Sequence, residues 1–128
     1  MFELDQFVSD CRVALHADMP QIAVQDVVRR AVSTPGDVLK AIGEPQRAEM
    51  QTLYRSDDLT ILNVIWAPWM NLLPHNHQMW AIIGLYTGRE DNIFCDACRE
   101  AMAWLRLRAR EHCARKMPSH WAETSFIR

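Results

Sequence analysis

Hydrophobic positions near the start of the chain recur at the spacing of an amphipathic helix. They are Leu4, Phe7, Val8, Cys11 and Leu15. This pattern predicts a helix over residues 3–17, which Met19-Pro20 ends, and a second helix over residues 20–32. A short third helix is expected next. Ser33 or Thr34 would cap it, Pro35 would lie in its first turn, and Gly43 would end it.

After Pro45 the pattern changes to the alternation and the β-branched runs that are typical of strands. Strands are expected over residues 50–54, 59–66 and 79–87, and a further strand would begin at Ile93-Phe94. Helices followed by closely spaced strands predict an α+β fold in which the strands form a small antiparallel β-barrel or sandwich.

The chain of 128 residues has the length of a single domain. We expect a helical part over residues 1–45, strands over 46–94 and an atypical tail over 95–128. The net charge is −5 over the first 94 residues and +3 over the tail, and the tail contains neither valine nor glycine. Ala97 to Ala114 predicts a weak, arginine-rich helix, so the tail is expected to be helical or disordered.

Composition and charge limit the kinds of partner and the cell compartment that we expect for this protein. A net charge of −2 gives no electrostatic attraction to nucleic acid or to an anionic membrane. No apolar run reaches the roughly 20 residues of a membrane-crossing helix. The acidic start of the chain lacks the features of a signal peptide, so we expect a cytoplasmic protein. Reduced thiols are then expected at Cys11, Cys95, Cys98 and Cys113.

The clearest chemical signal is a pair of histidines, His75 and His77, that leads into the apolar run over residues 79–87. On a strand, side chains two residues apart point to the same face. Neutral imidazole is a good ligand for Fe, Zn, Ni and Cu, so two imidazoles on one face predict a metal site. Such a pair also occurs as ordinary turn or core residues, and the flanking sequence decides between the two interpretations.

Residues 74–88 resemble the first metal-binding motif of the cupin superfamily. That motif lies on a small antiparallel barrel. It consists of a glycine, five residues, the H-x-H pair, usually a glutamate, and a later glycine. The two histidines match the paired ligands, and Gly88 matches the later glycine. Trp69 stands where the early glycine is expected, and Ala81 stands where many cupins carry the glutamate ligand.

Without the glutamate, the segment is similar to the thiol dioxygenase branch of the cupins, which includes cysteine dioxygenase and its bacterial relatives. The similarity covers about residues 1–94 and includes the strand-like segment YRSDDLTILNVIWAP. It implies a non-haem Fe(II) centre held by three histidines, with Zn, Ni and Mn as alternative metals. It also implies that a small thiol is oxidised by O2 to a sulfinic acid at open coordination positions.

The same resemblance implies an arginine that binds the carboxylate of the substrate, and Arg55 is the candidate. The alternative is that Arg55 is a solvated loop residue beside Asp57 and Asp58. Trp80 and Tyr86 are expected to pack in the core, as strand aromatics usually do.

After Phe94 no histidine lies in the context of an apolar strand, and the character of the sequence changes abruptly. One hypothesis accounts for both: the reading frame shifts near residue 94 or 95. Back-translation of residues 116–128 with GC-rich codons, read from the third base of each codon, gives DAVALGRDVIHS. That string resembles the second cupin motif and supplies a histidine, and sequencing the gene across the codons for residues 90–100 tests the idea.

Two other functions compete with the dioxygenase. The first is a truncated, non-catalytic cupin that binds metal weakly or not at all, and that self-associates through strands left uncovered. The second is a structural zinc site in the tail. Its candidate ligands are Cys95, Cys98, His112, Cys113 and His120, although the seven residues between the two histidines exceed the usual gap of about 3–5.

Overall fold

Three helices open the fold, each where the apolar spacing predicts one. In the computed structural model α1 spans Leu4–Ala14, α2 spans Pro20–Val32 and α3 spans Pro35–Ile42. Both prolines lie in the first turn of their helices, where a missing backbone N–H leaves no hydrogen bond unmade. Gly43 ends α3 with a φ of 102°, as predicted. In the described part of the chain no helix has both the length and the apolar character needed to cross a membrane.

Strands follow the helices, which confirms the α+β class. The structure describes residues 1–73, 75, 77–92, 94–97, 105–108 and 122–127. The strands in these ranges are β1 Glu49–Arg55, β2 Thr60–Trp66, β3 Ile82–Thr87, β4 Phe94–Ala97, β5 Leu105–Arg108 and β6 Ala122–Ile127. The first three match the predicted strands, although the third begins three residues later than the apolar run.

The main sheet has the strand order β1-β2-β6-β3, and every neighbouring pair is antiparallel. Because β2 and β3 both run antiparallel to β6, they are parallel to each other. β1 and β2 form a hairpin whose register shifts between Thr52 and Tyr54, so that Leu53 is an extra residue on the edge strand. The strands β4 and β5 pair separately as a second, two-stranded sheet.

The structure of the tail differs from the predicted helical or disordered segment. Residues 105–108, inside the expected arginine-rich helix, form the strand β5, and residues 122–127 form β6 in the middle of the main sheet. Apolar periodicity failed here because β6 takes its place through backbone hydrogen bonds to β2 and β3, which no local pattern encodes. The rest of the expected helix, at residues 98–104 and 109–114, lies outside the described residues.

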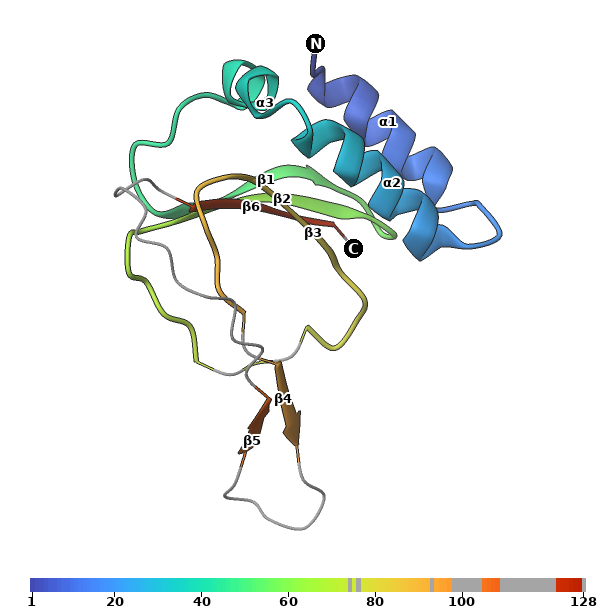
Figure 1. Cartoon of the computed structure of the whole chain (residues 1–128). Helices are drawn as coiled ribbons and strands as arrows, with labels where there is room; N and C mark the ends of the chain where they lie inside the picture. The colour runs from blue at the N-terminus through green and yellow to red at the C-terminus, as the bar shows by residue number, and fades with distance from the viewer. Residues whose placement is uncertain (74, 76, 93, 98–104, 109–121, 128) are drawn as a thin grey trace.

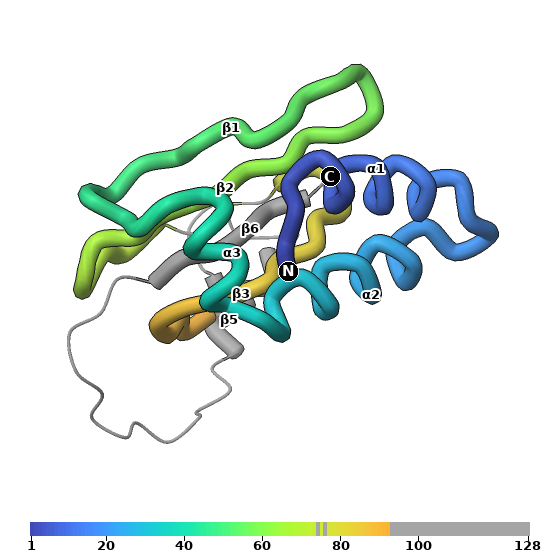
Figure 2. The backbone as a smooth tube through the Cα atoms, turned by 90° about the horizontal axis from the view of Figure 1, so that it is seen from above, coloured from blue at the N-terminus to red at the C-terminus, as the bar shows by residue number. Residues whose placement is uncertain are grey.

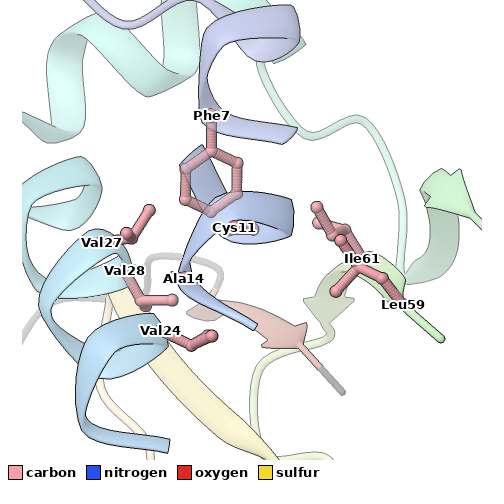
Figure 3. Packing of buried hydrophobic residues seen from close by; sticks show 8 residues of the cluster. All are labelled: Phe7, Cys11, Ala14, Val24, Val27, Val28, Leu59 and Ile61. Carbon is pink, nitrogen blue, oxygen red and sulfur yellow. The ribbon is translucent and has the colours of Figure 1, made fainter. Parts of the chain in front are cut away.

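The helices cover one face of the main sheet. Figure 1 shows α1 and α2 above the sheet, and Figure 2 shows the two helices side by side when the protein is seen from the helix side. The core forms where they meet β2, as Figure 3 shows. It consists of Phe7, Cys11, Ala14, Val24, Val27, Val28, Leu59 and Ile61. Burial and the nearby charge of Asp10 raise the pKa of the Cys11 thiol to about 12, so this cysteine behaves as an apolar core residue.

Helix α2 packs closely on β3 because residue 84 is a glycine. A Cβ atom at Gly84 would lie 2.5 Å from Cγ1 of Val28 and 2.8 Å from Cγ1 of Val32. Side chains on β3 alternate accordingly: Gly84 and Tyr86 are buried, whereas Ile83 and Leu85 are exposed. Helix α2 therefore fixes which face of β3 is covered, and the opposite face keeps exposed apolar side chains.

Candidate metal centre

His75 and His77 lie in the irregular segment between β2 and β3, and both are exposed. The prediction that they share a strand face is wrong, because β3 begins only at Ile82. The two imidazole rings lie together nevertheless, with ring centres 5.1 Å apart and planes inclined by 45°. Figure 1 shows this connecting segment on the side of the sheet away from the helices.

One of the two rings is held by the backbone. The Nδ1 atom of His75 lies 2.9 Å from the carbonyl oxygen of Leu73. A carbonyl oxygen only accepts hydrogen bonds, so Nδ1 carries the proton in the neutral ring and Nε2 keeps its lone pair. Metal-bound histidines commonly donate their second ring N–H to a backbone carbonyl in this way. Nε2 is therefore the nitrogen through which His75 would bind a metal.

The distance between the two ring centres is close to that of two histidines bound to one metal ion. With metal–nitrogen bonds of about 2.0–2.1 Å, the ion lies about 3.2 Å from each ring centre, and a tetrahedral angle separates the centres by about 5.2 Å. The observed separation is 5.1 Å. Among the described residues, no three His, Cys, Asp or Glu side chains are grouped so as to hold a metal ion. His75 and His77 are thus a pair of candidate ligands, without a third such side chain grouped with them among the described residues.

Three backbone positions around the pair have a positive φ, which favours glycine. The φ is 63° at Trp69, 54° at Gln78 and 72° at Gly88. Residues 69 and 88 are the two positions at which the cupin motif has its early and late glycines, whereas residue 78 has no glycine counterpart in that motif. A positive φ costs a residue with a Cβ roughly 1–2 kcal/mol, and for a bulky residue it is rare. The conformation at residue 69 therefore suits the glycine of the motif better than the tryptophan that is present.

Replacing Trp69 with glycine is expected to give a protein about 1 kcal/mol more stable than the Trp69→Ala variant, because only glycine adopts this φ without strain. The Trp69 side chain is 95% exposed, so both substitutions remove little packing and differ mainly in backbone strain. Urea denaturation of the two variants measures the difference. Equal free energies of unfolding would show that residue 69 is not strained.

Arg55 ends β1 and is exposed. The turn after it lies near the end of α1: a hydrogen bond from the Ser56 hydroxyl lowers the pKa of Asp58, and the charges of Arg12 and His16 lower it further. The structure thus places Arg55 next to a turn beside α1, and no hydrogen bond or ion pair between described residues joins it to the histidine pair. A substrate-binding role for Arg55 stays a prediction.

A polar network crosses the sheet, buried at Asn63 and Tyr86 and exposed at Arg47, and the sequence pattern did not predict it. The Tyr86 hydroxyl donates to Oδ1 of Asn63 at 2.8 Å, and Nδ2 of Asn63 donates to Oε1 of Gln51 at 2.9 Å. Gln51 donates in turn to Glu49 at 2.6 Å, and Arg47 donates to the same carboxylate at 3.0 Å. The available signal was one asparagine inside the apolar run LTILNVIW.

The two aromatic residues near the histidines are core residues, as predicted. Tyr86 is buried, and Trp80 is half-buried and packs against the core cluster. Of the ligands proposed for a zinc site in the tail, Cys95 lies on β4, and the others lie outside the described residues: Cys98, His112, Cys113 and His120. The zinc site therefore stays a prediction.

Comparison with known proteins identifies no relative of this chain. No protein-family model matches the chain, and neither a curated protein nor a solved structure matches it significantly. Function is therefore inferred from the residues and their geometry.

Proposed function

We propose that this chain carries the first half of a cupin of the cysteine dioxygenase-like branch. His75 and His77 are two of the three histidine ligands to Fe(II). The reaction joins one thiol and one O2 to give a sulfinic acid, with both oxygen atoms ending on sulfur. The observation that carries this proposal is the pair of imidazoles at 5.1 Å, one of them held by the Leu73 carbonyl in the orientation of a metal ligand.

The backbone around the pair supports the same family. The positive φ values at residues 69 and 88 fall at the two glycine positions of the cupin motif. The exposed side chains of Ile83 and Leu85 point away from the helices. In a cupin the corresponding face of the sheet lines the interior of the barrel, where the metal is bound.

The third histidine would come from a strand later than β4. The proposed change of reading frame near residue 94 removes that strand and leaves the tail in its place. In this view β6 fills a gap between β2 and β3 without restoring the ligand. When bound, iron supplies open coordination positions for a thiolate and for O2. The two histidines bind and orient the ion, and Arg55 is the candidate for the substrate carboxylate.

Iron content and O2 uptake test the proposed function. The full chain is loaded with Fe(II) without oxygen and then assayed with cysteine and with 3-mercaptopropionate. His75→Ala and His77→Ala are each expected to lower the affinity for iron by at least about tenfold, because each removes one ligand nitrogen. His16→Ala is the matched control, since His16 is also exposed but lies just after α1. Unchanged iron binding in both test variants would contradict the proposal.

A non-catalytic cupin is the second candidate function. It rests on the sequence after Phe94, where no histidine lies in the context of an apolar strand. Iron that binds weakly through His75 and His77, without O2 uptake with either thiol, is the result expected for this candidate. Stoichiometric iron with turnover would exclude it.

A further inference from the structure

The histidine pair can be completed by a second copy of the chain. His75 and His77 are exposed, so the nitrogen atoms of a second molecule can approach an ion that the pair holds. Zinc in proteins is almost always bound by four ligands arranged tetrahedrally when the site is structural. Two imidazoles from each of two copies make such a set, and the ring separation of 5.1 Å fits the tetrahedral angle.

The surface around the pair suits contact between two identical molecules. The side chain of Trp69 is 95% exposed and that of Leu73 is 85% exposed. Other exposed apolar residues of the same segment are Met70, Leu72 and Met79. Residues 67–81 contain no Asp, Glu, Lys or Arg, so this segment adds no charge repulsion of its own between two copies. Several exposed apolar residues on one short segment are the kind of feature from which an interaction surface can be built.

We propose that two copies of this chain share one Zn(II) ion through His75 and His77 of each, and that the exposed apolar residues of the segment between β2 and β3 form the rim of the contact. The contact is isologous, because the same surface is used on both sides. This inference rests on the proposed role of the two histidines as metal ligands. It differs from the dioxygenase in stoichiometry: one ion for two chains instead of one ion for each.

Titration with zinc chloride, followed by light scattering and analytical ultracentrifugation, tests the inference on the full chain. The molecular mass is expected to double from 14.9 kDa and to stop rising once one zinc ion has been added for every two chains. EDTA is expected to return the protein to the monomer. His75→Ala and His77→Ala are expected to stay monomeric, with folding checked by circular dichroism. His16→Ala is expected to dimerise like the unaltered chain.

A second pair of variants tests the apolar rim. Leu73→Ser keeps the backbone carbonyl that holds His75 and removes an exposed apolar side chain, so it is expected to weaken zinc-dependent dimerisation about tenfold. Val13→Ser removes an exposed side chain from α1 and is expected to change nothing. Equal dimerisation constants for the two variants would contradict a contact through this segment.

The outcomes separate this inference from the proposed function. Zinc bound at one ion per chain without a change of mass overturns the shared site. So does a dimer that persists in EDTA or in the His75→Ala variant. Iron turnover by the monomer supports the dioxygenase, and the zinc titration alone decides the shared site. A zinc-linked dimer without O2 uptake supports the shared site and overturns the enzyme.

Discussion

Replacing Gly84 with alanine is expected to destabilise the protein by about 2–3 kcal/mol. The added Cβ would lie 2.5 Å from Cγ1 of Val28 and 2.8 Å from Cγ1 of Val32, well inside van der Waals contact. Both valines are β-branched and stand on α2, where one χ1 rotamer dominates, so neither can turn away cheaply. The helix or the strand must move instead, and the packing of α2 on β3 is lost.

Chemical denaturation with urea measures this effect. Gly36→Ala is the matched control, because a Cβ at Gly36 meets no atom within 4 Å and the residue lies inside α3. Alanine there is expected to raise stability by about 0.5–1 kcal/mol, since it favours the helix more than glycine does.

The cause of the Gly84 effect is tested by a double variant. Combining Gly84→Ala with Val28→Ala removes the closer of the two clashing methyl groups. The double variant is expected to be more stable than the sum of the single effects by about 1 kcal/mol or more. Simple additivity would show that the close contact between α2 and β3 does not cause the loss.

Replacing Asn63 with leucine is expected to destabilise the protein by about 2–3 kcal/mol. Asn63 is 1% exposed, accepts a hydrogen bond from the Tyr86 hydroxyl and donates one to Gln51. Leucine has a similar size but can do neither, so the buried Tyr86 hydroxyl and the half-buried Gln51 amide lose their bonds to residue 63. The loss is measured by urea denaturation.

Two further variants show whether the polar network is responsible. Asn71→Leu makes the same chemical change at an exposed position, and it is expected to alter stability by less than about 0.5 kcal/mol. Adding Tyr86→Phe to Asn63→Leu removes the hydroxyl as well, and it is expected to recover part of the loss because both partners are then apolar. A double variant that is no better than Asn63→Leu would contradict a role for this hydrogen bond.

The start of the chain was predictable because its signals are local. The apolar spacing of α1 and the prolines and glycine that bound α2 and α3 act within a few residues, and the structure has the three helices where they were expected. The end of α1 differs: His16 and Ala17 already bond to residues three positions back, so the helix closes at Ala14. The alternation and β-branched residues of β1 and β2 also act locally, and both strands formed.

The candidate site was only partly predictable. The sequence pointed to His75 and His77 through their spacing and their apolar neighbours, and the structure places their rings together. The predicted shared strand face was wrong, because the pair lies in the irregular segment before β3 and not on a strand. The hydrogen bond to the Leu73 carbonyl depends on the backbone conformation of that segment, which the pattern of residue types does not encode.

By itself the sequence determined the three helices, the first strands, the α+β class and the identity of the histidine pair, because short-range spacing and residue chemistry specify them. Tertiary structure alone decided that β6 lies between β2 and β3, that α2 needs a glycine beneath it at residue 84, and that Asn63 links Tyr86 to Gln51. These features join residues far apart in the chain, and they arise only from the packing of complete elements against one another.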